Sequence, residues 1–237
     1  STAMLVSIAE TLRELEAGGE ARCVILRGAG DKAFSAGMDL TAVPSGAPED
    51  LQGRIESKGP LQYAAEAIEG SPLPVIAMIR GYALGGGCEL AMACDLRVGA
   101  EGCRMGMPPA RLGIVYPPEG LSRFIRVLGL AACKKLFLTA RYLEGREAYE
   151  TGLLHYLVPD GELEVFTMEL ARETASRAPL ALAGIKRSLH ILSRHASPNE
   201  EEAAEMQALI ARALSSRDVM EAMAAFREKR DPRFRGE

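Results

Sequence analysis

Apolar side chains recur every three or four residues at the start of the chain. Helical spacing of this kind places them on one face of an amphipathic helix over residues 3–17. Gly18-Gly19 follows and is typical of a helix end. The chain is therefore expected to begin inside an element, so the residues give no basis for judging an N-terminal targeting segment. The apolar positions are Met4, Leu5, Ile8, Leu12 and Leu15.

Further along, short uninterrupted apolar runs alternate with helical patterns. Cys23–Leu26 and Val75–Ile79 are typical of buried parallel strands. Further strands are expected at about 96–98, 103–105 and 153–158, and residues 28–60 are expected to form a long loop. Helices are expected at about 61–70, 85–93, 120–128, 131–139, 145–151, 162–177, 180–192, 200–214 and 216–229. This order predicts an α/β core followed by a helical C-terminal part.

Charge and composition exclude several function classes. The net charge of −4 over 237 residues and the absence of Trp argue against a nucleic-acid binder. No run of 18 apolar residues predicts a membrane span. Five cysteines without a C-x-x-C pair argue against a disulfide framework or a zinc site and favour a reducing compartment, and the last residues are not a peroxisomal signal. We therefore expect a cytoplasmic protein. The three histidines show no metal-ligand spacing, so no metal is expected.

Two glycine-rich segments are candidate binding loops. Gly28–Ala33 fits the dinucleotide fingerprint, but no helix pattern follows it, so a plain turn is favoured. Gly81–Glu89 lacks the Lys-Ser/Thr pair of a phosphate loop. Its three glycines, Gly85-Gly-Gly87, lie where a strand meets a helix, and unpaired N–H groups there suit an oxyanion. Tight packing of the helix on the strand is the alternative reason for these glycines.

Together, these motifs resemble the crotonase superfamily of enoyl-CoA hydratases and isomerases. The resemblance covers essentially the whole chain, through Lys32–Leu40, Gly81–Asp95, Leu112-Gly113, Ala178-Pro179-Leu180 and Ala225–Arg230. It implies a crotonase-type ββα spiral over residues 1–175, without the first strand or strands of the family. Residues 176–237 would form a helical region that covers coenzyme A and joins subunits into a trimer or a dimer of trimers.

The resemblance also implies an oxyanion site. The backbone N–H groups of Met38 and Gly86 would hold the thioester oxygen of an acyl-CoA, because an enolate gathers its charge on that oxygen. The backbone carbonyl of Ala36 would contact the adenine. Coenzyme A would arrive as part of the substrate, so no separate cofactor is expected. Further contacts with it are expected from Gly37, Asp39, Leu40, Gly85 and Lys229.

The acidic residues separate the activities of the family. Hydratases hold a water between two glutamates, and Glu89 matches the first of them. The second falls at Pro109, which cannot move a proton, so ordinary hydration is disfavoured. Glu119, in a Glu-Gly loop similar to that of the monofunctional isomerases, would carry a proton from C2 to C4 of the acyl chain. Partial burial with a raised pKa would suit that role, whereas the alternative is a surface residue that caps a helix.

Other activities stay open. The chain also resembles the methylmalonyl-CoA decarboxylases, whose active-site tyrosine corresponds to Tyr116 and whose loop histidine corresponds to Met38. Decarboxylation of a substituted malonyl-CoA is therefore the first alternative, and hydration is the second. A protein that binds acyl-CoA without catalysis is the third. The main hypothesis is an enoyl-CoA isomerase that acts through an oxyanion-stabilised enolate.

Overall fold

Strands and helices alternate along most of the chain in a computed structural model, which describes residues 1–38, 59–112, 115–194 and 200–237. The strands are β1 (Val24–Arg27), β2 (Ala33–Ser35), β3 (Val75–Ile79), β4 (Tyr82–Leu84), β5 (Leu96–Ala100), β6 (Arg104–Gly106), β7 (Tyr142–Glu144) and β8 (Tyr156–Val158). The helices are α1 (Thr2–Gly18), α3 (Pro60–Gly70), α4 (Gly86–Ala93), α5 (Pro118–Thr139), α6 (Gly145–Glu150), α7 (Leu163–Ala175), α8 (Pro179–Arg194), α9 (Glu200–Leu214), α10 (Arg217–Glu228) and the 3₁₀ helix η1 (Pro109–Leu112).

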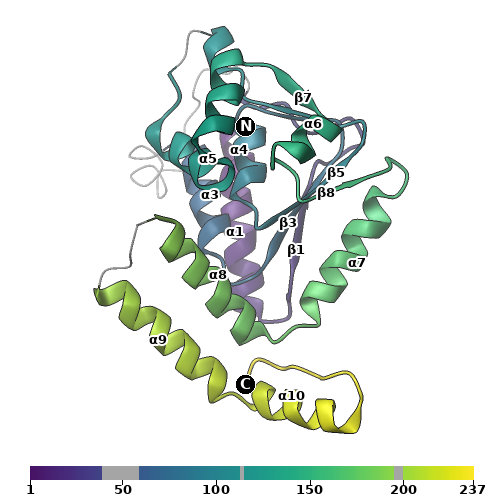
Figure 1. The fold of residues 1–237 in the computed structure, drawn as a ribbon, viewed down its shortest axis with the longest axis vertical. Coiled ribbons are helices and arrows are strands. Elements are labelled where there is room, and N and C mark those ends of the chain that lie inside the picture. The colour runs from purple at the N-terminus through teal and green to yellow at the C-terminus, as the bar shows by residue number, and fades with distance from the viewer. Residues whose placement is uncertain (39–58, 113–114, 195–199) are drawn as a thin grey trace.

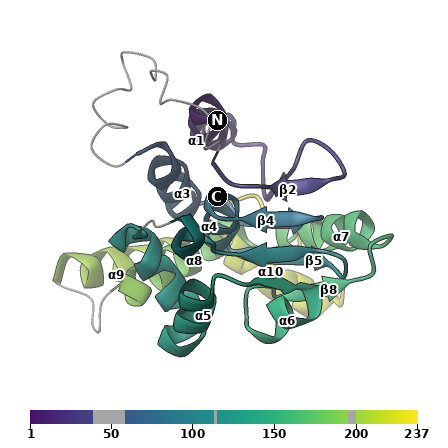
Figure 2. The same cartoon turned by 90° about the horizontal axis from the view of Figure 1, so that it is seen from above.

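The strands form two four-stranded sheets whose neighbours come from distant parts of the chain. One sheet has the order β1-β3-β5-β8 and is parallel throughout, with Val24 opposite Val75. The other has the order β2-β4-β6-β7, in which only the β6–β7 pair is antiparallel. Figure 2 shows β2 and β4 side by side. Each turn of the chain thus adds one strand to each sheet, which confirms the predicted ββα spiral.

Helices cover both faces of the first sheet, which explains its uninterrupted apolar strands. Along β3, Val75, Ala77 and Ile79 join a core with α3 and α4. Ile76 and Met78 point the other way and join a second core with α7. Figure 1 shows α7 on one side of β1, β3, β5 and β8, with α1, α3 and α4 on the other. Because both faces are buried, this sheet positions the loops at its ends rigidly.

Several expectations need correction in detail. The expected loop over 28–60 contains β2, and most of the remainder, 39–58, lies outside the described residues. The strands β4 and β7, which have only three residues each, were not predicted from the sequence. By contrast, the two helices expected at 120–128 and 131–139 are confirmed: both lie within α5, and Gly129, whose φ of 75° is not helical, separates them at a kink.

The helices after α7 form the C-terminal part of the fold. Figure 1 shows α9 beside α8, and α10 with the C-terminus farther from the strands. The expected division after residue 175 stays a prediction. Among the described helices, none is both long and apolar enough to cross a membrane. In the same part of the chain, no three His, Cys, Asp or Glu residues lie together as metal ligands would.

Candidate active site

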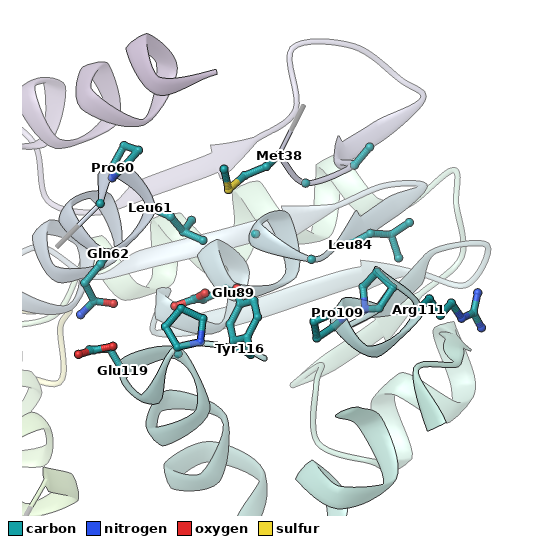
Figure 3. A pocket seen from close by; sticks show the side chains of 18 of the residues that line it. Met38, Pro60, Leu61, Gln62, Leu84, Glu89, Pro109, Arg111, Tyr116 and Glu119 are labelled. Carbon is teal, nitrogen blue, oxygen red and sulfur yellow. Dashed lines mark hydrogen bonds between the residues drawn. The ribbon is translucent and has the colours of Figure 1, made fainter. Parts of the chain in front are cut away.

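One cavity of about 670 Å³ collects most of the predicted site residues. It lies where β2, the β4–α4 junction, η1 and the start of α5 meet, and Figure 3 shows side chains that line it. Its walls are largely apolar, with Leu61, Leu84 and Pro108 among them. Apolar walls with a few polar groups are typical of small-molecule sites. The predicted residues in its lining are Ala36, Gly37, Met38, Gly85, Gly86, Glu89, Tyr116 and Glu119.

The two expected oxyanion loops are in close contact at this cavity. A Cβ on Gly37, whose φ is 96°, would lie 2.8 Å from the Leu84 carbonyl oxygen and 3.6 Å from the Gly86 nitrogen. Only glycine allows that approach, because no Cβ fits there. Gly86 is the first residue of α4, so its N–H has no partner within the helix and lies at the positive end of the helix dipole. That the Met38 and Gly86 N–H groups share one oxygen stays a prediction.

Glu89 is buried at the cavity floor and has both carboxylate oxygens occupied. Its side chain lies in the first turn of α4, and the residue is 3% exposed. The Tyr116 hydroxyl donates to Oε2, and the Arg123 guanidinium donates to Oε1. Burial raises the pKa of Glu89, against the hydrogen bond from Tyr116 and the charge of Arg123, which lower it. Glu89 is therefore a buried carboxyl group with a raised pKa.

Tyr116 lies just before α5 and lines the cavity beside Glu89 (Figure 3). Its ring packs on Phe137 at 5.6 Å between centroids. A Cβ on Gly120 would lie 2.5 Å from the Tyr116 ring and 3.1 Å from Glu89 Oε1. Burial and the charge of Glu89 raise the pKa of Tyr116, so its hydroxyl stays protonated. A side chain at Gly120 would therefore clash with the Tyr116 ring and crowd the Glu89 carboxylate.

Glu119 lines the same cavity from the first turn of α5, but it is exposed. The expected partial burial of this residue is therefore wrong, since the start of the helix leaves its side chain open to solvent. In Figure 3 it lies on the same side of Tyr116 as Gln62, with Arg111 on the opposite side. Pro109 also lines the cavity. The position of the second hydratase glutamate thus faces the cavity without a carboxylate.

Comparisons with known proteins agree with this geometry. The family model described as enoyl-CoA hydratase/isomerase matches residues 1–237. The chain belongs to the enoyl-CoA hydratase/isomerase family. It is 36% identical to methylmalonyl-CoA decarboxylase of Escherichia coli K12 over 218 residues, which are 92% of this chain and 82% of that protein.

Other members of the family carry different activities in their names. The chain is 34% identical to the probable mitochondrial enoyl-CoA hydratase 2 of Arabidopsis thaliana, over 98% of this chain and 76% of that protein. Among solved structures, an enoyl-CoA hydratase/carnithine racemase from Magnetospirillum magneticum superposes with a TM-score of 0.88 at 32% identity. That comparison covers 100% of this chain and 87% of the other. Family and fold are thus shown, whereas the reaction differs among these relatives.

Three residues expected to bind coenzyme A are not among the described residues that line the cavity. Asp39 and Leu40 lie outside the described residues. Lys229 follows the end of α10, is exposed, and is absent from the described lining of the cavity. A contact between Lys229 and coenzyme A therefore stays a prediction.

Arg123, the buried cation behind Glu89, was not predicted from the sequence. This residue of α5 is 1% exposed and contacts Glu89, Glu69 and Gln62. The sequence offered little signal for it, because the spacing of Leu121, Phe124 and Leu128 places Arg123 away from the apolar face of the predicted helix. The partners themselves were hidden, because Glu89 lies 34 residues and Glu69 lies 54 residues away in the chain.

Proposed function

We propose that this family member acts on acyl-CoA thioesters and shifts a proton along the acyl chain through an enolate, as an enoyl-CoA isomerase does. The family match supports the substrate class. The meeting of the Gly37 and Gly86 loops supports an oxyanion site, because two aimed N–H donors would stabilise the negative charge on the thioester oxygen. One such donor is worth ~3–4 kcal/mol of barrier.

A single observation carries the choice of isomerisation. Glu119 reaches the cavity, and its carboxylate has no hydrogen bond or ion pair within the described part of the chain. Glu89, by contrast, has both oxygens engaged. Glu119 would take a proton from C2 of a 3-enoyl thioester, the electron pair would move toward the thioester oxygen, and the same proton would return at C4. The 3,4 double bond would thereby become a 2,3 double bond.

Two features favour isomerisation over hydration. Pro109 stands in the cavity wall at the position that the resemblance gives to the second hydratase glutamate. A water molecule held between two carboxylates therefore lacks one of its two bases. The free carboxylate that remains, Glu119, suits a single-base proton shift.

The test replaces each carboxylate in turn and follows a panel of CoA thioesters by mass spectrometry in deuterated water. Glu119→Gln keeps the shape of the side chain but cannot carry the proton, so turnover of 3-enoyl thioesters should fall ~10²–10⁴-fold. Binding of the thioester should change little. Glu150→Gln, on the exposed surface of α6, is the matched control and should leave turnover unchanged.

Other outcomes of this experiment would contradict the proposed activity. Full activity of Glu119→Gln together with loss of activity in Glu89→Gln contradicts isomerisation through Glu119. Tight binding without incorporation of deuterium by the unmodified protein would indicate a binding protein rather than an enzyme.

Decarboxylation of a substituted malonyl-CoA is the second candidate. Tyr116 in the cavity wall and the 36% identity to methylmalonyl-CoA decarboxylase favour it. Loss of carbon dioxide leaves the enolate directly, so no carboxylate base is needed. Against it, Glu119 and Glu89 would repel the carboxylate of such a substrate. Turnover of a malonyl-type thioester by both glutamine variants, with a slower Tyr116→Phe variant, would favour this candidate.

A further inference from the structure

The guanidinium of Arg123 joins three helices beneath the cavity. From α5, its Nε donates to Glu69 Oε1 at 2.8 Å and its Nη2 donates to Glu69 Oε2 at 3.1 Å, so it grips one carboxylate of α3 with two hydrogen bonds. Nη2 also lies 3.3 Å from Gln62 Oε1. The remaining nitrogen, Nη1, donates to Glu89 on α4. A planar guanidinium can bind two carboxylates in this way, and a lysine cannot.

The charges in this buried cluster balance. Arg123 is 1% exposed and faces two carboxylates, Glu69 and Glu89. Arg126 lies 3.2 Å from Glu69 Oε1 and supplies a second cation, farther from the cavity. Two cations and two anions make the cluster neutral, which burial requires. Of these two cations, only Arg123 contacts both carboxylates, so it is the cation that can stabilise the negative charge of Glu89 directly.

The contacts of Glu89 determine what Tyr116 presents to the cavity. Both Glu89 oxygens accept hydrogen bonds, so a proton on either oxygen would compete with a donor that is already there. The Tyr116 hydroxyl has one hydrogen, which it gives to Glu89. Its oxygen is then available to the cavity as an acceptor, in a direction that Glu89 sets.

We propose that Arg123 is a positioning residue, which holds Glu89 as a carboxylate and through it fixes the Tyr116 hydroxyl at the cavity. Glu89 then accepts the hydrogen bond that orients Tyr116 and does not itself transfer a proton. The inference rests on the proposed function only in taking this cavity as the reaction site. It holds whether Glu119 or another group moves the proton.

The charges around Glu89 predict in which direction its pKa should change when each of them is removed. Tyr116 and Arg123 face Glu89 from the side of α5, and Glu69 faces it from α3, while Glu119 lines the same cavity from the first turn of α5. Burial raises the pKa of Glu89, Tyr116 and Arg123 lower it, and the charge of Glu69 raises it. Removal of Arg123 should therefore raise this pKa further, and removal of the Glu69 charge should lower it.

The experiment follows the carboxyl carbon of Glu89 by NMR in protein labelled with ¹³C-glutamate, without substrate, with Glu89→Gln to assign the signal. In Arg123→Met the midpoint of titration should rise by ~1–3 pH units, because a neighbouring opposite charge shifts a carboxyl group by that much. Arg123→Lys keeps the cation and should recover part of the shift. Arg126→Met, whose side chain contacts Glu69 but not Glu89, should shift it less. Glu69→Gln should shift it the opposite way.

Turnover completes the test. The acid limb of the kcat/KM profile should move with the Glu89 midpoint in each variant, since protonated Glu89 no longer holds the Tyr116 hydroxyl. An unchanged midpoint in Arg123→Met, or an acid limb that stays in place while the midpoint moves, overturns the proposal. If Arg123→Met does not fold, an upward or absent shift in Glu69→Gln overturns it equally. Full activity of Glu119→Gln would refute the isomerase assignment alone, because the NMR midpoints do not depend on it.

Discussion

His155 lies beside the buried guanidinium of Arg97, and the partial desolvation of its ring together with that charge sets its protonation. The Arg97 side chain donates to the carbonyl oxygens of Leu153 at 2.8 Å and Cys94 at 2.9 Å. His155 Nδ1 accepts the Arg97 backbone N–H at 3.1 Å, and its Nε2 lies 3.2 Å from the guanidinium. Burial, together with the charge of Arg97, lowers the pKa of His155 to about 4. The ring is therefore neutral in the folded chain.

This pair predicts a pH dependence of stability. The unfolded chain takes up a proton on His155 near the ordinary pKa of 6.5, whereas the folded chain does so only at about 4. Stability should fall as the pH falls through that window, because the unfolded state binds more protons. In the His155→Asn variant, the decrease in stability between pH 6.5 and about pH 4 should be smaller, because this proton uptake is absent. Urea unfolding followed by circular dichroism above, within and below the window checks it, and an equal difference between the two proteins at every pH contradicts it.

At the scale of elements, Lys186 connects α8 to the core of the fold through three hydrogen bonds. Its Nζ donates to the carbonyl oxygens of Ile68 and Leu73 at 3.0 and 2.9 Å and to Asp95 Oδ2 at 2.7 Å. Asp95 also accepts the Val75 N–H at 2.7 Å, at the start of β3. One ammonium group thus joins α8 to the end of α3, to Leu73 before β3 and to Asp95 between α4 and β5, and Asp95 in turn contacts the start of β3.

We expect Lys186→Met to destabilise the fold by ~3 kcal/mol, since it leaves a half-buried carboxylate and two carbonyl oxygens without their cation. The next residue provides a matched control. Arg187 pairs with Glu205 on α9 where both side chains are more than a third exposed, so Arg187→Met should cost ~1 kcal/mol or less. Equal denaturation midpoints of the two variants would contradict a central role for Lys186.

At the scale of the whole molecule, apolar side chains remain exposed on several helices. Contiguous apolar surface on a single chain is typical of a protein–protein interface. On α8, Ile185 is 59% exposed, Leu189 62% and Leu192 46%, and their spacing places them along one side of the helix. This stripe is the candidate surface for contact with a second copy of the chain, in line with the trimer or dimer of trimers that the resemblance implies.

The prediction is that the protein sediments as a trimer or a larger closed assembly. Replacing Ile185 and Leu189 with Glu should yield a smaller species with an unchanged far-ultraviolet circular dichroism spectrum, because charge at a buried interface disfavours association. Sedimentation velocity measures both proteins. A monomer for the unmodified chain, or an assembly that survives both substitutions, contradicts the assignment.

Local patterns were sufficient for the long elements. The apolar run Val75–Ile79 and the helical spacing of residues 3–17 depend on neighbours in the chain, so the sequence predicted β3 and α1 nearly to the residue. The glycine loops and Glu89, Tyr116 and Glu119 were predicted through the family resemblance, and the fold brings all of them to one cavity.

The tertiary structure alone decided what depends on residues far apart in the chain. The three-residue strands β2, β4 and β7 are held by pairs such as Ala33 with Tyr82 and Met105 with Leu143, which no local pattern encodes. In the same way, Arg123 reaches Glu69 and Glu89 across three helices. The protonation of a site depends on burial and on the nearest charges, and both arise only when distant segments pack together. The sequence, through the family resemblance, thus indicated most of the candidate residues that meet at the cavity, and the fold decided that Glu89 is buried and hydrogen-bonded whereas Glu119 is exposed.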